Sequence, residues 1–152
     1  MQTKIIGLVI LISLLSHSCA DKYSNETKLF QKYLGEVFHE KMPENKHIYL
    51  LIAQFRCAGC VEQTLGKIAG KVTRMSKPEV TVITYDSNLI PVSLTKNVQV
   101  LLDKDSGYEA IQSIANIALI KTENGKILTV KMINLDDSDK IIEEEFNKKD
   151  SL

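Results

Sequence analysis

The spacing of apolar positions changes along the chain, and each spacing predicts a type of secondary structure. Between residues 29 and 38 apolar residues recur three and four positions apart, which predicts an amphipathic helix. Its apolar face holds Leu29, Phe30, Tyr33, Leu34, Val37 and Phe38. The next apolar run, Ile48–Ala53, is continuous and rich in β-forming residues, which predicts a buried strand. The period then becomes helical again at Val61, Leu65 and Ile68, and Gly70 is expected to end this second helix.

The second half of the chain contains short apolar runs separated by turn residues. Asn124-Gly125 between two such runs predicts a β-hairpin. The expected elements are strands at Val80–Tyr85, Val98–Leu102, Ile117–Ile120 and Ile127–Val130, a loop at Asp86–Thr95, and helices at Tyr108–Ser113 and Ile141–Phe146.

Strands that alternate with helices indicate an α/β fold, in which a central mixed sheet has helices on both faces. We expect Ile48–Ala53, Val80–Tyr85 and Ile117–Ile120 to lie side by side as a parallel sheet, with Ile127–Val130 antiparallel to the last of them. Functional sites of such sheets lie beyond the carboxyl ends of the strands. The segment that follows Ala53 occupies such a position.

The N-terminus has the organisation of an export signal. Lys4 is followed by the apolar stretch Ile5–Leu15 and then by Ser16-His17-Ser18-Cys19. A cysteine at this point resembles the lipobox of bacterial lipoproteins, and the resemblance implies cleavage after residue 18 and acylation of Cys19. Residues 1–18 are therefore expected to be a signal peptide and the polar residues 19–27 a tether. Acyl chains on Cys19 would anchor the protein in a membrane. The alternative is an ordinary secretory signal, with Cys19 incidental.

Composition narrows the function further. The formal net charge of the 152 residues is zero and the pI is near 6.8, which argues against a nucleic-acid partner. With Cys19 acylated, Cys57 and Cys60 remain as one close pair in an exported, disulfide-permissive setting. One such pair does not form the disulfide framework of a small secreted fold.

Cys57-Ala58-Gly59-Cys60 follows the first predicted strand and opens the second predicted helix. Unpaired amide groups and the dipole at a helix start favour a thiolate, and Arg56 adds a positive charge. These effects lower the pKa of a thiol, so Cys57 is the expected nucleophile. Cys60, about one turn later, is placed to resolve a mixed disulfide on Cys57.

The succession of strand, CxxC, helix and a later hairpin, IALIKTENGKILTV, resembles the thioredoxin-like superfamily, particularly the short lipoprotein thiol–disulfide proteins of the Bacteroidetes type. The resemblance spans roughly residues 46–133 and implies a thioredoxin-like domain at residues 28–152. Arg56 stands where the superfamily usually has Trp, and no proline occurs at 113–116 where its cis-proline is expected.

The resemblance implies dithiol–disulfide exchange with protein or small-molecule thiols and disulfides. It also implies attachment to the bacterial cell envelope, where we expect the outer membrane. No cofactor or resident metal is expected, because the electrons reside on the two sulfurs.

Two other functions use the same cysteines. Cys57-Ala58-Gly59-Cys60-Val61 is similar to the loop of heavy-metal-associated domains, which bind a soft ion such as Cu(I) between two thiolates. The pair is also compatible with a non-catalytic binding module, in which it forms a static disulfide or idle thiols.

Other polar residues have ordinary structural interpretations. His39 and His47 are expected at the surface. Asp136, Asp137 and Asp139 lack the spacing of a calcium loop and are expected to cap a helix. Glu143, Glu144 and Glu145 are expected to form a solvated helix face.

Overall fold

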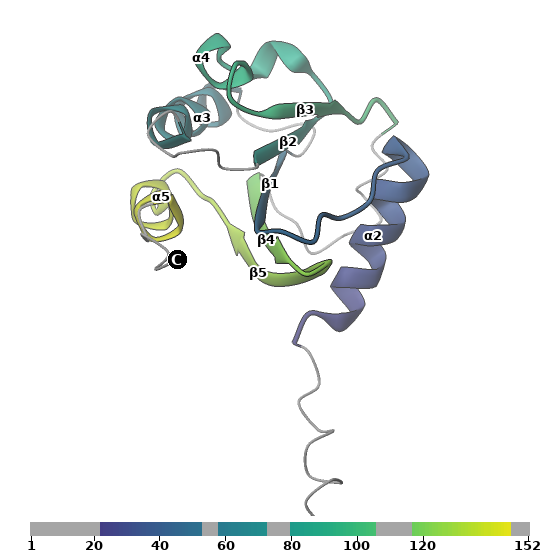
Figure 1. The fold of residues 1–152 in the computed structure, drawn as a ribbon. Coiled ribbons are helices and arrows are strands. Elements are labelled where there is room, and N and C mark those ends of the chain that lie inside the picture. The colour runs from purple at the N-terminus through teal and green to yellow at the C-terminus, as the bar shows by residue number, and fades with distance from the viewer. Residues whose placement is uncertain (1–21, 53–57, 73–79, 106–116, 147–152) are drawn as a thin grey trace, which may run out of the picture.

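The computed structural model of the protein describes residues 22–52, 58–72, 80–105 and 117–146 (Figure 1). The described elements are α2 (Ser24–Phe38), β1 (His47–Ile52), α3 (Ala58–Val72), β2 (Val80–Thr84), the 3-10 helix η1 (Ser87–Leu89), α4 (Val92–Thr95), β3 (Gln99–Leu102), β4 (Ile117–Glu123), β5 (Lys126–Met132) and α5 (Ser138–Phe146). The α/β class and the mixed sheet are confirmed. Ala53 and the expected helix at Tyr108–Ser113 lie outside the described residues.

The sheet has five strands in the order β3-β2-β1-β4-β5. β1 is parallel to β2, and β2 is parallel to β3, whereas the β1–β4 and β4–β5 pairs are antiparallel. The three strands expected side by side are neighbours, but the expected parallel direction is wrong for β4. Ile117, the first residue of β4, pairs with Ile52, the last residue of β1. β4 thus begins at the edge of the sheet where β1, β2 and β3 end, and it runs antiparallel to β1.

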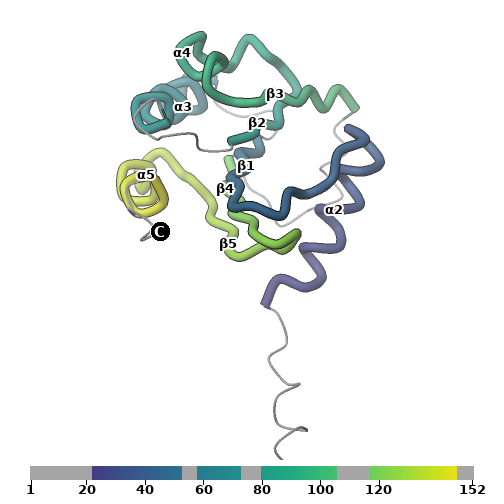
Figure 2. Tube along the Cα trace, in the orientation of Figure 1, coloured from purple at the N-terminus to yellow at the C-terminus, as the bar shows by residue number. Residues whose placement is uncertain are grey.

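Helices cover both faces of the sheet (Figures 1 and 2). In β1 the alternate residues Ile48, Leu50 and Ile52 join the apolar cluster under α3 and α5, while Tyr49 and Leu51 join the cluster under α2. Every residue of β1 is buried. A strand that is covered on both faces has apolar residues at successive positions, not at alternate ones. This continuous apolar run is why β1 could be predicted from the sequence.

The first helix differs from its prediction at both ends of its apolar face. Leu29 and Val37 are exposed, because the buried side is centred on Phe30, Tyr33 and Leu34. The helix also begins at Ser24, inside the segment that was predicted to be a tether.

Thr27, from the same predicted tether, is buried in the folded domain. Its hydroxyl accepts a hydrogen bond from the backbone N–H of Ile127 at 3.1 Å. Residues 24–27 are all polar, so the sequence did not indicate that they form the first turn of a helix that packs on the sheet.

Two further boundaries need correction. Gly70 lies within α3, which continues to Val72, so Gly70 does not end the helix. The expected loop at 86–95 contains η1 and α4, and it buries Ile90 and Leu94. η1 and α4 are three and four residues long, too short for a helical repeat of apolar positions to show in the sequence.

The predicted hairpin is confirmed. Asn124 and Gly125 have φ values of 51° and 66°, the left-handed conformation that a type I′ turn requires at both central positions. Their backbone N–H groups donate to the carbonyl oxygens of Glu44 and Pro43 at 2.7 and 3.2 Å. The segment between α2 and β1 therefore supports the tip of the hairpin.

The central strand should dominate the stability of the fold. Leu50 is fully buried in β1, so Leu50→Ala should lower the free energy of unfolding by about 2–5 kcal/mol through lost apolar burial and the cavity left behind. Leu128→Ala removes the same atoms from a side chain that is 51% exposed, and its effect should stay within about 0.5 kcal/mol. Urea unfolding of both variants measures this difference. Equal losses would contradict the packing.

Candidate thiol site

The candidate site lies where β1 gives way to α3. β1 is the middle strand of the sheet, and its carboxyl end lies at the same edge as the carboxyl ends of β2 and β3 because these strands are parallel. α3 begins at Ala58 and packs Val61, Leu65, Ile68 and Val72 against the sheet. The first turn of a well-packed helix is thus fixed at the edge where α/β proteins place their sites.

Cys60 is the predicted site residue that the structure describes. It lies in the first turn of α3, is half-buried, and is disulfide-bonded. The other two cysteines of the chain, Cys57 and Cys19, lie outside the described residues, as does Arg56. Ala58 and Gly59 are exposed beside Cys60. A partner can therefore approach the start of the helix closely.

The electrostatics of this turn favour negative charge. The first backbone N–H groups of a helix have no partner within the helix, and the macrodipole places its positive end there. α3 has no acidic residue in its first turn, so no carboxylate of that turn competes for these groups. A sulfur at this position can alternate between a disulfide and a thiolate, which is the chemistry of thiol exchange.

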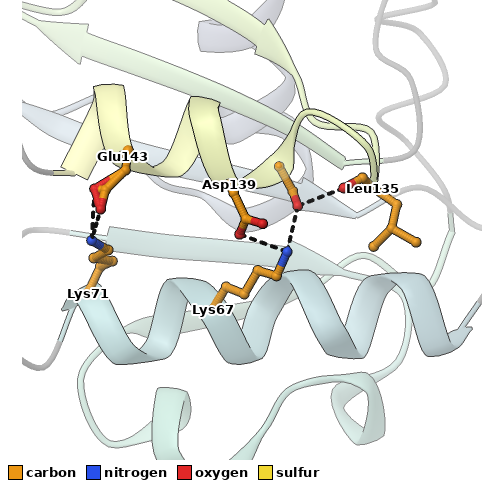
Figure 3. Close-up of polar contacts among 6 residues, drawn as sticks. Lys67, Lys71, Leu135, Asp139 and Glu143 are labelled. Atoms are coloured by element: carbon orange, nitrogen blue, oxygen red, sulfur yellow. Dashed lines mark hydrogen bonds and ion pairs between the residues drawn. The ribbon is translucent and has the colours of Figure 1, made fainter.

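Ion pairs and a hydrogen bond between side chains attach α3 to α5 (Figure 3). Lys67 Nζ lies 2.8 Å from Asp139 Oδ1 and donates to Ser138 Oγ at 3.1 Å. Ser138 is buried, and its hydroxyl donates to the carbonyl oxygen of Leu135 at 2.9 Å. One turn further on, Lys71 Nζ lies 2.6 Å from Glu143 Oε1. These bridges fix the orientation of the helix that carries Cys60.

A groove of about 430 Å³ runs between α3 and α5. Its lining residues are Gly66, Lys67, Gly70, Lys71, Asp139, Ile142 and Glu143. The two lysines of this lining are paired with its two carboxylates, so the charges of the groove are already neutralised by one another.

The glutamates of α5 do not all form a solvated face, as had been expected. Glu145 is buried, and its carboxylate oxygens lie 2.8 Å from Lys121 Nζ and 2.7 Å from Lys131 Nζ. Glu144 also pairs with Lys131, at 2.8 Å, while Glu143 pairs with Lys71. The lysines that pair with Glu144 and Glu145 lie on β4 and β5. Contacts between segments that are distant in the sequence cannot be predicted from the local residue pattern.

These contacts set the protonation of the cluster. Burial alone would raise the pKa of Glu145, but hydrogen bonds from Lys121 and Lys131, together with their charges, outweigh it and lower that pKa. Hydrogen bonds from Glu144 and Glu145 raise the pKa of Lys131. The cluster is therefore fully ionised at neutral pH.

The two histidines lie away from the thiol site. His39 is exposed and ends α2 in a left-handed conformation, as expected of a surface residue. His47 is buried in β1, so its surface prediction is wrong. The hydroxyl of Thr81 donates to Gln99 Oε1 at 3.1 Å, and its oxygen accepts from His47 Nε2 at 2.9 Å. His47 lies at the amino end of β1, the end opposite α3.

The three aspartates lie at the start of α5, with Asp139 in its first turn, and the capping role of their side chains stays a prediction. Asp137 Oδ1 accepts the N–H of Asn134 at 2.9 Å, and its carbonyl oxygen accepts the N–H of Ile141 at 3.0 Å. Asp139 pairs with Lys67. Over the described ranges the structure contains no group of three or more residues suited to hold a metal ion.

One buried polar pair was missed in the sequence. Asp103 follows the last residue of β3 and is fully buried, and Tyr33 Oη on α2 donates to its Oδ2 at 2.7 Å. An aspartate after an apolar strand resembles any turn residue, so nothing local distinguished it. The pair attaches α2 to the carboxyl-end edge of the sheet, on the face opposite α3.

Comparison of the chain with family models, curated proteins and solved structures finds no significant match. Among the described residues, no helix has the length and apolar character needed to cross a bilayer.

Glu145 gives the fold a measurable dependence on pH. Its folded-state pKa lies below the ordinary value of 4.5, so its stabilisation is present above that value and is lost as the pH falls through the folded pKa. Glu145→Gln should lower the free energy of unfolding at pH 7 by about 1.5–3 kcal/mol, because two charged hydrogen bonds are lost, and should flatten the acid dependence.

Denaturant titrations from pH 7 to pH 3 measure both effects. Glu144→Gln, on the exposed side of α5, is the matched control and should have a much smaller effect. A wild-type stability that is independent of pH in this range would contradict the role of Glu145.

Proposed function

We propose that the protein is a membrane-anchored, thioredoxin-like thiol–disulfide exchange protein of the bacterial cell envelope, with Cys57 and Cys60 as its exchanging pair. The observation that carries the proposal is the position of Cys60, half-buried, disulfide-bonded and in the first turn of a helix that follows the central strand. In the proposed oxidised form, Cys57 is the disulfide partner of Cys60.

The reaction runs in two exchange steps. The thiolate of Cys57 attacks a partner disulfide, which forms a mixed disulfide and releases one partner thiolate. The thiolate of Cys60 then attacks the Cys57 sulfur, which closes the 57–60 disulfide and releases the second partner thiolate. The pair loses two electrons and two protons, and the partner disulfide gains both. The reverse sequence oxidises a partner dithiol.

The assignment of roles follows the order of the two cysteines in the sequence. Cys57 precedes α3, next to Arg56, whereas Cys60 lies within the first turn and is half-buried. We assign Cys57 as the nucleophile that meets the partner and the half-buried Cys60 as the thiol that resolves the mixed disulfide. The exposed Ala58 and Gly59 allow the backbone of a protein partner to approach. The buried packing of α3 holds Cys60 in the first turn of the helix.

The mixed sheet, with a cysteine in the first turn of the helix that follows its central strand, is compatible with a thioredoxin-like protein. The partners are protein or small-molecule thiols and disulfides, and the exchange needs no cofactor because both electrons reside on sulfur. Acylation of Cys19 would anchor the domain to a membrane, and we propose that this is the outer membrane.

The two cysteines should behave differently when exchanged for serine. In full-length protein that also carries Cys19→Ala, Cys60→Ser should accumulate mixed disulfides with a model disulfide substrate, because the resolving thiol is gone. Cys57→Ser should accumulate several-fold fewer. In iodoacetamide labelling as a function of pH, Cys57 should ionise below the free-thiol value of about 8.5. Non-reducing electrophoresis with mass spectrometry identifies the adducts.

Metal analysis of the same reduced preparations separates exchange from soft-metal binding. Stoichiometric copper that needs both cysteines, without trapped adducts, would favour the metal-binding function. Two thiols that label together near the free-thiol value would favour a static pair and refute the activated nucleophile.

The anchor makes a separate prediction. Cys19→Ala should release the protein from the membrane fraction, because the acylated residue is removed, while wild-type protein sediments with membranes and carries acyl chains on its N-terminal peptide. Ser18→Ala, next to the modified residue, is the control and should remain membrane-bound. A Cys19→Ala variant that still sediments, together with an unmodified wild type, would refute the anchor.

A further inference from the structure

The distance between the proposed lipid anchor and the folded domain is short. α2 begins at Ser24, and the described chain already starts at Lys22, so only Ala20 and Asp21 separate Lys22 from Cys19. An extended chain spans at most about 3.6 Å per residue, which limits the Cα distance from Cys19 to Lys22 to about 11 Å. This argument rests on the proposed acylation of Cys19. If Cys19 is acylated, the N-terminal end of α2 must lie close to the membrane.

The N-terminal end of α2 lies at one edge of the sheet. Thr27 accepts a hydrogen bond from Ile127 of β5, and Gln31 Nε2 donates to the carbonyl oxygen of Gly125 at 2.8 Å. β5 is an outer strand, and β3 forms the opposite edge. Figure 1 shows the start of α2 beside the β4–β5 hairpin, with β3 and α4 at the far end of the molecule.

The exposed side chains at this edge suit a lipid surface. Leu29 and Leu128 are 47% and 51% exposed, which makes them two of the large apolar side chains that the fold leaves in solvent. Lys22, Lys28 and Lys126 are also exposed. We call these five residues the β5-edge face. Glu26 and Glu123 lie at the same edge and are half-buried, and the exposed Glu44 lies beside the hairpin turn. Lysine is therefore in excess among the exposed charges of this edge.

We propose that the β5-edge face rests on a bilayer surface that contains anionic lipid headgroups. The short link to Cys19 brings the face to the membrane, its lysines attract anionic headgroups, and Leu29 and Leu128 contact the interfacial layer. The β3 edge and α4 then point away from the bilayer. β1 lies two strands from β5, about 10 Å at the usual strand spacing, so the thiol site is close to the membrane but not covered by it.

Lysine modification measures this orientation on the full chain. Acylated wild-type protein is reconstituted into vesicles of phosphatidylcholine with phosphatidylglycerol and treated with a water-soluble acetylating reagent, and each lysine is quantified by mass spectrometry. Lys22, Lys28 and Lys126 should react several-fold more slowly than in Cys19→Ala protein mixed with the same vesicles. Lys96 and Lys104, exposed near the β3 edge, are internal controls and should react at equal rates in both samples.

A lengthened link tests the geometric constraint itself. Insertion of about twelve Gly and Ser residues between Ala20 and Asp21 keeps the acylated cysteine but frees the domain from the surface. The insertion variant should still sediment with vesicles, and its Lys22, Lys28 and Lys126 should recover most of their reactivity.

Equal slowing of both lysine sets, or protection that survives the insertion, would overturn the proposed orientation. An N-terminal peptide without acyl chains would refute both the anchor and the orientation. The mixed-disulfide assay is done without Cys19, so it reports on thiol exchange independently of either result.

Discussion

Burial of β1 on both faces is the constraint on which the rest of the structure depends. All of its residues are buried, and both of its edges are paired, to β2 on one side and to β4 on the other. Such a strand cannot fold alone, because its two faces need separate apolar layers. α2 supplies one layer, and α3 with α5 supplies the other. The start of α3, and therefore Cys60, is positioned by this two-sided packing.

The second determinant is electrostatic and acts on the closing helix. α5 contributes carboxylates, and lysines from α3, β4 and β5 meet them. Exposed pairs of this kind contribute little to stability. Glu145 differs because it is buried between two lysines, so loss of its charge would leave both ammonium groups without that partner. The pairing also gives α5 one register on the sheet, since Ile142 and Phe146 alone would allow other positions.

Features with a local cause could be predicted from the sequence. The continuous run of β1 and the Asn124-Gly125 turn each depend on the conformational preferences of adjacent residues, and both are confirmed. The direction of β4, the burial of His47 and the lysine partners of Glu145 depend on contacts between distant segments. Of the candidate site, the helix that starts after β1 and carries Cys60 could be predicted. The chemistry of Cys57, Arg56 and Cys19 depends on residues outside the described ranges, so it stays a prediction.

The helix that carries Cys60 is weak on its own, which connects the packing to the proposed chemistry. Gly66 and Gly70 lie within α3, and glycine costs a helix interior about 1 kcal/mol relative to alanine. Within the described part of the chain, a Cβ atom at either position would meet no atom within 4 Å, so packing against these residues does not require glycine. The helical state of α3 must therefore come mainly from its burial in the apolar cluster against β1. The dipole at the first turn, and the amides there that have no partner within the helix, exist only while the helix is formed. Any stabilisation of a thiolate at this turn is thus coupled to the docking of α3, and sequence changes far from the cysteines can alter their reactivity.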